Sequence, residues 1–306
     1  MPITLATPDE FASHHIADGS ARVEGYDVTL GWENGAHAYA SAFTDKPDYD
    51  ITILPLSNFL IALDKGYPLI GIPVFIDLFF PQIAVRVNKA AGITSPKDLE
   101  GKRVGVRGFG FSPAVWVRGG FADVYGLDLS KVTWVTAEPN SLSGVEISTP
   151  AGWTVESGAD LAADLESGKL DAVLWDRGGP ALTPNTANLF DDPLAEALKY
   201  YEQSKFMPLN SMLLARTSVM DENPGLGDAI VDASETAREL YLSYAKEDDN
   251  YMGLPVKWLR EHGMFPYENG VENNRVALET IIRYAHEQGV ISRRPDPAEL
   301  FYAGAL

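Results

Sequence analysis

The sequence contains no cysteine among its 306 residues. This absence excludes disulfide bridges, thiolate catalysis and cysteine-based metal sites, and it leaves the redox compartment undecided. Basic residues are scarce as well: 24 Lys and Arg stand against 43 Asp and Glu, which gives a formal net charge of −19. Nucleic acid and anionic lipid repel such a chain, so we expect neither a nucleic-acid partner nor a membrane partner.

Long hydrophobic runs are also missing. The longest apolar stretches, such as residues 69–75, are far shorter than the roughly 20 residues of a membrane-spanning helix. Residues 1–6 show no basic region, no long apolar segment and no lipidation cysteine, so we expect a cytoplasmic protein. A periplasmic receptor whose export signal had been removed would begin in the same way.

Signatures of metal and nucleotide sites are absent too. His14 and His15 are adjacent, whereas zinc-binding histidines on a helix stand four residues apart. The glycine-rich stretch 108–112 is not followed by Gly-Lys-Ser/Thr and lacks the full dinucleotide G-x-G-x-x-G pattern. It also lacks the second glycine of a serine nucleophile elbow. We therefore expect neither a metal nor another cofactor. A divalent ion held by two distant histidines and an aspartate is the alternative that stays open.

The chain does have 45% hydrophobic residues and an alternation of strand-like and helix-like segments, which predicts an α/β fold. Its order fits two lobes with a ligand cleft between them, the first built from residues 1–82 and 213–306 and the second from residues 83–212. The expected strands are 3–6, 26–32, 49–54, 69–75, 83–87, 103–106, 132–136, 172–175 and 210–215. The expected helices are 11–18, 36–42, 57–65, 160–167, 230–245 and 275–289.

One strand-to-helix junction stands out as a candidate binding element. The apolar strand 103–106 runs into a glycine-rich turn, and Ser112 and Pro113 follow where a helix N-cap and the first helical residue are expected. Free N–H groups and the helix dipole attract anions at such a junction. Arg107 and Arg118 add charge partners for a carboxylate. The junction therefore predicts a site for a small acid, although an ordinary connection shows the same pattern.

Further candidates follow the ends of expected strands, where ligands bind in open α/β sheets. Adjacent helical residues point about 100° apart, so we expect one of His14 and His15 to face the cleft as an acid or base. An exposed pair near a helix start is the structural alternative. Asp176 is a further catalytic candidate, and its alternative is a salt-bridged loop. The remaining substrate-binding candidates are Ser57, Asn58, Phe109, Phe111, Trp116, Arg177, Asn210 and Ser211.

The three aromatic candidates suit an aromatic ligand, because Phe109, Phe111 and Trp116 can sandwich a ring between them. Trp116 at helical spacing fits a core position equally well. Arg118 is the expected carboxylate anchor.

Several segments resemble a known family. They are Gly71-Ile-Pro-Val-Phe, Asp98-Leu-Glu-Gly-Lys-Arg-Val-Gly-Val, Val115-Trp-Val-Arg-Gly, Gly270-Val-Glu-Asn-Asn-Arg and Tyr284-Ala-His-Glu-Gln-Gly. Along nearly its whole length the chain resembles the 4,5-dihydroxyphthalate decarboxylases, which share the two-lobed, type II periplasmic-binding-protein fold. The resemblance implies a cofactor-independent decarboxylase that acts on a small hydroxylated aromatic or related cyclic carboxylic acid.

The chain departs from that family at three places. The family's Asp-Arg-x-Arg pattern is replaced by Phe11-Ala-Ser-His, an Arg-His pair by Pro81-Gln82, and a histidine by Ser211. We therefore expect a divergent member with a different or smaller substrate. Two alternatives stay open: a solute-binding protein for a small organic anion, and another reaction on a cyclic metabolite. The apolar C-terminal residues 300–306 also allow a homo-oligomer.

Overall fold

Two sheets, each in its own compact unit, organise the chain. The computed structural model describes residues 2–7, 14–44, 46–137, 147–175, 179–251, 254–264 and 268–305. Unit 1 comprises Met1–Leu78, Leu209–Glu279 and Pro295–Leu306, and unit 2 comprises Phe79–Pro208 and Thr280–Arg294. Thr280–Arg294 thus belongs to unit 2, whereas the sequence predicts that all of 213–306 belongs to the first lobe. The physical reason is that side chains of this segment pack on a helix of unit 2, as described below.

The sheet of unit 1 has the strand order β2-β1-β3-β11-β4. Its strands are β1 (Ile3–Ala6), β2 (Val28–Gly31), β3 (Ile51–Pro55), β4 (Leu69–Leu78) and β11 (Leu209–Arg216). Strands β1, β2 and β3 are parallel, and β11 runs antiparallel to both β3 and β4. The carboxyl ends of β1, β3 and β4 therefore meet the amino end of β11 at one edge of the sheet.

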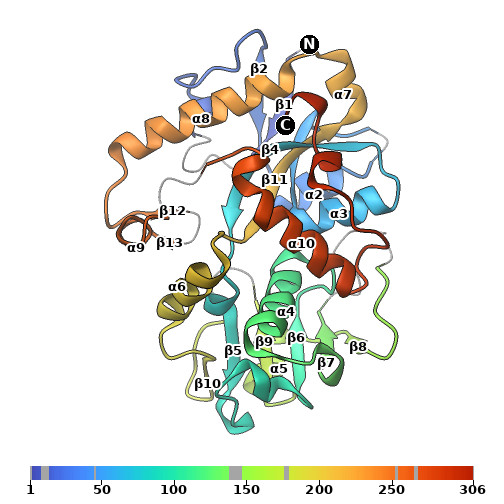
Figure 1. The fold of residues 1–306 in the computed structure, drawn as a ribbon, viewed down its shortest axis with the longest axis vertical. Coiled ribbons are helices and arrows are strands. Elements are labelled where there is room, and N and C mark those ends of the chain that lie inside the picture. The colour runs from blue at the N-terminus through green and yellow to red at the C-terminus, as the bar shows by residue number, and fades with distance from the viewer. Residues whose placement is uncertain are drawn as a thin grey trace. The chain divides into compact units, whose positions relative to one another are not determined.

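Helices cover this sheet and complete the core of unit 1. The helix α8 buries Leu226, Ile230 and Ala233 in one apolar cluster with residues of β1, β3, β4 and β11 (Figure 1, orange). The helices are α1 (His14–Ala17), α2 (Gly35–Ser41), α3 (Leu56–Asp64), α7 (Thr217–Glu222), α8 (Leu226–Tyr244), α9 (Val256–Glu261) and the start of α10 (Arg275–Glu287). A hairpin of β12 (Asn250–Tyr251) and β13 (Leu254–Pro255) precedes α9.

The C-terminal segment also belongs to the core of unit 1. Phe301 forms an isolated parallel bridge with Gly71 of β4, and the amide of Tyr302 donates to the carbonyl of Gly71. The ring of Phe301 packs edge-on against Phe75, with 6.4 Å between ring centroids. Phe301 and Tyr302 thus pair with the outer edge of β4, the edge strand of this sheet.

The sheet of unit 2 has the strand order β10-β5-β9-β6-β7-β8. Its elements are β5 (Val85–Asn88), β6 (Arg103–Val106), β7 (Thr133–Thr136), β8 (Thr154–Ser157), β9 (Ala172–Leu174), β10 (Thr186–Asn188), α4 (Ser112–Tyr125), α5 (Leu161–Glu166) and α6 (Pro193–Ser204). Strands β9, β6, β7 and β8 are parallel, and β5 is antiparallel to β9 and β10. Every residue of α4 from Ser112 to Phe121 is buried, as expected of a helix that is apolar all round.

Short 3-10 turns connect these elements. In unit 2 they are Pro81–Ala84, Lys89–Ala91, Pro96–Leu99 and Leu129–Lys131, and in unit 1 they are Glu272–Asn274, Pro297–Leu300 and Ala303–Ala305.

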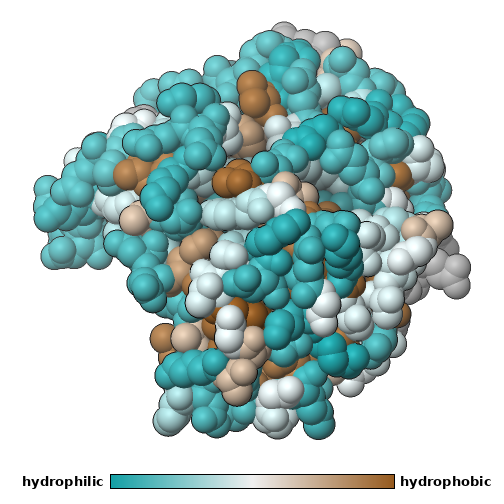
Figure 2. Space-filling model, turned by 60° about the horizontal axis from the view of Figure 1, so that its bottom comes forward, coloured by the Kyte–Doolittle hydropathy of each residue, from teal (hydrophilic) through white to brown (hydrophobic). Residues whose placement is uncertain are grey.

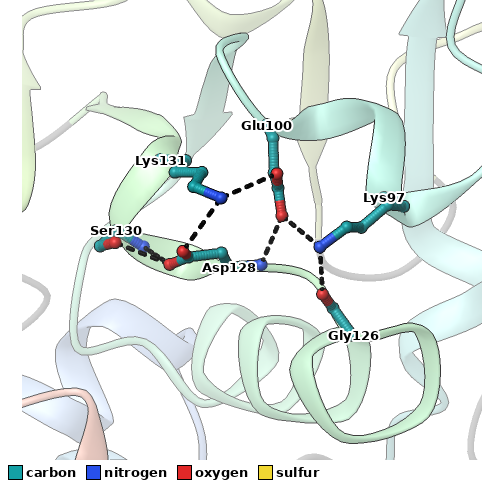
Figure 3. Close-up of polar contacts among 6 residues, drawn as sticks. All are labelled: Lys97, Glu100, Gly126, Asp128, Ser130 and Lys131. Atoms are coloured by element: carbon teal, nitrogen blue, oxygen red, sulfur yellow. Dashed lines mark hydrogen bonds and ion pairs between the residues drawn. The ribbon is translucent and has the colours of Figure 1, made fainter.

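A polar network fastens two of these turns at the amino edge of the unit 2 sheet (Figure 3). Glu100 accepts from Lys97 Nζ at 2.5 Å, from the Asp128 amide at 3.0 Å and from Lys131 Nζ at 3.4 Å. Lys97 also donates to the carbonyl of Gly126, the left-handed residue (φ 66°) that ends α4. The hydrogen bond from Lys97 holds the pKa of Glu100 below its usual value, helped by the Asp128 amide. The network ties the approach to β6 to the exit from α4.

Hydrophilic residues dominate the face of the molecule in Figure 2, and the hydrophobic residues gather there in small separate patches. Trp32, Leu182, Tyr244 and Val276 are large exposed apolar side chains among the described residues. Within the described part of the chain, no helix combines the length and the apolar composition needed to cross a bilayer.

Candidate functional site

A cluster of buried polar side chains lies at the carboxyl edge of the unit 1 sheet. We call it the carboxyl-edge cluster; its members are Thr7, Ser57, Asn58, Asp77, Asn210 and Ser211, all of which are buried. They come from the ends of β1, β3 and β4, from the first turn of α3 and from the start of β11. Ligands bind at this edge in open α/β sheets, so the cluster is a candidate site.

Asp77 and Asn210 form the centre of this cluster. The amide Nδ2 of Asn210 donates to Asp77 Oδ2 over 3.0 Å, and each side chain is 8% exposed. Asn210 was a candidate from the sequence, whereas Asp77 was missed because the strand was expected to end at Phe75. The one signal for Asp77 was a carboxylate at the end of a ten-residue run that is otherwise apolar.

An irregularity in the β4–β11 ladder positions Asp77. Ser211 pairs with Asp77, whereas the next residue, Met212, pairs with Phe75, so that Ile76 is an extra residue in β4. Such bulges bend a strand and redirect its side chains, and they often occur beside functional sites. On its other side Ser211 pairs with Pro55 of β3, so Ser211 lies between the ends of two neighbouring strands.

The first turn of α3 adds Ser57 and Asn58 beside Pro55. Pro55 is the N-cap residue of α3 and provides no side-chain cap. The helix begins at Leu56, one residue before the expected start at residue 57, so Ser57 and Asn58 lie inside its first turn. They are 0% and 1% exposed, so their polar groups lie in the interior at the end of β3.

Two polar atoms of the carboxyl-edge cluster lack partners. Thr7 Oγ1 and Asn210 Oδ1 are buried and have no hydrogen-bond partner within the described chain. Buried polar atoms almost always find a partner, so each such atom calls for water or a ligand group. Both atoms belong to side chains that are at least nine-tenths buried.

The glycine-rich junction of unit 2 lies at the carboxyl end of β6, as expected. Its strand matches the predicted residues 103–106, but α4 begins one residue earlier than predicted: Phe111 is the N-cap and Ser112 is the first helical residue. Ser112 is fully buried. Arg107 is exposed, and its guanidinium carbon lies 5.3 Å from the ring centre of Phe111.

Arg118 lies beneath this junction, fully buried on α4. Its Nε donates to Gln288 Oε1 at 2.6 Å, and its Nη2 donates to the carbonyl of Phe109. The Nη1 atom has no hydrogen-bond partner within the described residues. Burial lowers the pKa of Arg118 to about 9, so the guanidinium keeps its charge at neutral pH. In this position Arg118 connects the turn to the segment Thr280–Arg294.

The expected aromatic sandwich needs correction. Phe109 is 1% exposed; Arg118 covers its face at 4.2 Å, and Trp153 packs against it with 6.1 Å between ring centroids. Trp116 is completely buried and contacts Phe206 and Tyr284, each with 5.7 Å between ring centroids. Both side chains are therefore core residues whose faces are occupied by protein.

The histidine pair divides into one structural and one exposed residue. His15 Nδ1 and Nε2 hydrogen bond with Ser20 Oγ (2.9 Å) and with Tyr244 Oη of α8 (3.0 Å). Both ring nitrogens of His15 thus have hydrogen-bond partners, and the expectation that one histidine of the pair acts as acid or base stays a prediction. His14 has a side chain that is 53% exposed, and its Nε2 lies 3.8 Å from Asp18 Oδ2.

The remaining candidates, Asp176 and Arg177, lie outside the described residues. Among the residues that are described, no group of three or more His, Asp or Glu side chains has the geometry of a metal site.

Comparison with known proteins identifies the family. Residues 22–245 match the family model described as NMT1/THI5 like. The chain belongs to this family. Two curated relatives of this NMT1/THI5-like protein are named 4,5-dihydroxyphthalate decarboxylase. The one from Comamonas testosteroni is 28% identical and spans all of this chain and 98% of the relative. The one from Pseudomonas putida is 32% identical and spans 66% of this chain and 81% of the relative.

These relatives confirm the resemblance inferred from the sequence, and solved structures confirm the fold. The periplasmic aliphatic sulphonate binding protein SsuA from Escherichia coli has a TM-score of 0.56 at 13% identity, covering 100% of this chain and 99% of that chain. At this identity the likeness concerns the fold alone. The NMT1/THI5-like chain therefore has the two-lobed, periplasmic-binding-protein-like α/β fold.

Proposed function

We propose that this protein is a cofactor-independent decarboxylase that releases CO2 from a small hydroxylated aromatic acid similar to 4,5-dihydroxyphthalate. The observation that carries the proposal is the match to a curated 4,5-dihydroxyphthalate decarboxylase over the entire chain. A hydroxyl group para to the departing carboxylate supplies electrons to the ring, which is why this reaction can proceed without an added electron sink.

Each unit, taken by itself, supplies candidates for substrate-binding groups. In unit 1 they are the hydroxyl and amide groups of Ser57, Asn58, Asn210 and Ser211, which share one sheet edge. In unit 2 they are Arg107 and the first turn of α4 at Ser112, where N–H groups suit a carboxylate. Asp176 and Arg177 keep the roles that the sequence predicts for them.

Among the histidines, His14 is the proposed acid or base. Its ring is accessible, unlike that of His15, which is held between Ser20 and Tyr244. The replacement of the family's arginines and histidines by residues such as Gln82 and Ser211 supports a substrate that differs from the family's. Location in the cytoplasm and assembly into a homo-oligomer stay predictions from the sequence.

The test is incubation of the purified protein with 4,5-dihydroxyphthalate and a panel of hydroxylated aromatic acids, without added cofactor. We expect CO2 release from at least one acid, together with a ligand-induced rise in the thermal midpoint. No CO2 from any member of the panel would contradict the proposal.

The second candidate is a binding protein for a small organic anion. It is favoured by the fold likeness to a periplasmic sulphonate-binding protein. A thermal shift without CO2 release in the same experiment would support this candidate in place of the decarboxylase.

A further inference from the structure

We infer that Asp77 and Asn210 form a subsite that binds two adjacent ring hydroxyls and that Asp77 accepts the proton of one of them. This inference rests on the proposed function, because it assigns one part of a hydroxylated aromatic substrate to one part of the carboxyl-edge cluster.

The first step of the argument concerns hydrogen-bond polarity. The group of Asn210 that faces Asp77 is its NH2 group, because Nδ2 donates to Asp77 Oδ2 over 3.0 Å. The amide oxygen of Asn210 then points away from Asp77. This oxygen is buried and has no partner within the described residues. Asp77 and Asn210 thus present two neighbouring acceptors.

The second step concerns the ligand that fits two acceptors. A substrate carboxylate also carries only acceptors, so Asp77 and Asn210 would repel it. Two adjacent hydroxyls instead supply one donor for Asp77 and one for Asn210. Hydrogen bonds to a charged group are stronger than neutral ones. The pair therefore selects a vicinal diol, and it rejects a ring that lacks the hydroxyls, because the amide oxygen of Asn210 would then stay buried without a donor.

The third step concerns access and placement. Asp77 and Asn210 retain 8% exposure each, so they border the core without being enclosed by it. The bulge at Ile76 sets Asp77 opposite Ser211, at the edge where the ends of β3, β4 and β11 meet.

The chemical step follows from this placement. Asp77 takes the proton of the hydroxyl para to the departing carboxylate, and the electron pair of that O–H bond moves through the ring to the carbon bearing the carboxylate. That carbon accepts a proton from water; the C–C bond then breaks, CO2 leaves, and the bonding pair restores the ring. Asp77 returns its proton to the phenolate oxygen, so the net reaction consumes one solvent proton.

The experiment compares two ligands and three proteins by titration calorimetry. The ligands are 4,5-dihydroxyphthalate and phthalate, which share both carboxylates and differ in the two hydroxyls. The proteins are the wild type, Asp77→Asn and the matched control Asp50→Asn. Asp50 accepts from Thr4 at the opposite, amino edge of the same sheet, so its substitution makes the same chemical change away from the subsite.

We expect Asp77→Asn to weaken binding of 4,5-dihydroxyphthalate by about 10- to 100-fold and that of phthalate less than about 2-fold. Asp50→Asn should leave the ratio of the two dissociation constants unchanged. Turnover of any hydroxylated substrate should fall at least as far as binding in Asp77→Asn. An equal loss for both ligands, or no loss for either, would overturn the inference.

A second variant decides the matter if Asp77→Asn does not fold. Asn210→Ala removes the other acceptor and should show the same loss for the dihydroxy ligand only. The two proposals fail on different results. If binding depends on the hydroxyls but no CO2 is released, the proposed subsite is supported and the proposed decarboxylase activity is contradicted. If CO2 is released but the variants do not discriminate between the two ligands, the decarboxylase activity is supported and the subsite is contradicted. If the wild type binds neither ligand, both proposals are contradicted.

Discussion

At the scale of single residues, Arg118 shows how burial changes the meaning of a charged side chain. The sequence suggested a carboxylate anchor next to a glycine-rich turn. The structure has the guanidinium between the carbonyl of Phe109 and the amide of Gln288, against the ring of Phe109. These contacts hold the turn in place, so Arg118 influences any ligand at the junction through the position of that turn.

Arg118→Ala should therefore destabilise the protein in addition to weakening acid binding. We expect a loss of about 2–5 kcal/mol in the free energy of unfolding, because a large buried side chain and its hydrogen bonds are removed. Denaturant unfolding measures this loss. The exposed neighbour Arg107 serves as the control, since Arg107→Ala should change stability by no more than about 0.5 kcal/mol. Weakened binding at unchanged stability would show that Arg118 acts as an anchor only.

The sequence predicted part of the candidate site and missed its centre. Asn210 and Ser211 were found because they open the expected strand 210–215 and because Ser211 stands where the family carries a histidine. Asp77 was not, because its position depends on the extra residue Ile76 in the ladder with β11, and a bulge leaves no periodic signal in the sequence. A tryptophan suits a core position and a binding site equally well, so the sequence could not assign Trp116. Its complete burial in the structure makes it a core residue.

At the scale of elements, α4 and the later part of α10 pack closely because the residue of α4 at their contact, Gly119, has no side chain. A Cβ atom on Gly119 would lie 2.2 Å from Cδ2 and Cγ of Tyr284. The Tyr284 ring cannot easily yield, because its hydroxyl donates to Asp123 at 2.8 Å and its ring contacts Trp116. Burial also raises the pKa of Tyr284 and keeps the hydroxyl a donor.

Gly119→Ala should consequently lower the free energy of unfolding by about 1–3 kcal/mol through overpacking. The adjacent Gly120→Ala is the matched control: its Cβ would meet Tyr200 at 3.4 Å, an ordinary contact. Alanine favours the helix over glycine, so this control should be neutral or up to about 1 kcal/mol more stable. Chemical denaturation of both variants tests the pair, and equal effects would contradict the role of Tyr284.

Elements with a strong apolar pattern were predictable, and exposed ones were not. The strand 103–106 was predicted to the residue, and α8 was predicted with a start four residues late. Strand β8 (Thr154–Ser157) was missed because it is a largely exposed edge strand, without the alternation that indicates a half-buried strand. Helix α6 (Pro193–Ser204), which buries only Ala197 and Tyr200, was missed as well.

At the scale of the whole molecule, the excess of acidic residues is partly organised into local networks. Asp98, Glu100, Asp128 and Glu156 all have pKa values below those of free side chains, in each case chiefly because hydrogen-bond donors face the carboxylate. A carboxyl group whose pKa is lower in the folded than in the unfolded chain stabilises the folded state at every pH above its unfolded pKa. This stabilisation is lost as the pH falls through the lower, folded value.

The thermal midpoint should therefore fall as the pH is lowered from about 5 to about 3. Glu100→Gln should show a smaller decrease over this range, because it lacks one of the carboxylates that must be protonated. Glu239→Gln, on the exposed side of α8, is the control and should follow the wild type. Calorimetry at several pH values tests this, and coincident curves for Glu100→Gln and the wild type would argue against a role for the network in Figure 3.

The division of each unit among distant chain segments bears on how the protein is made. Unit 1 uses the first 78 residues, but its sheet needs β11 and its core needs Phe301 and Tyr302 against Gly71. In unit 2, Arg118 meets its partner Gln288 only after 170 further residues have been added. On the ribosome, neither unit is complete until almost the entire polypeptide has been synthesised. The nascent chain thus exposes apolar strands without their partners throughout translation, and we expect it to need chaperone protection until synthesis ends.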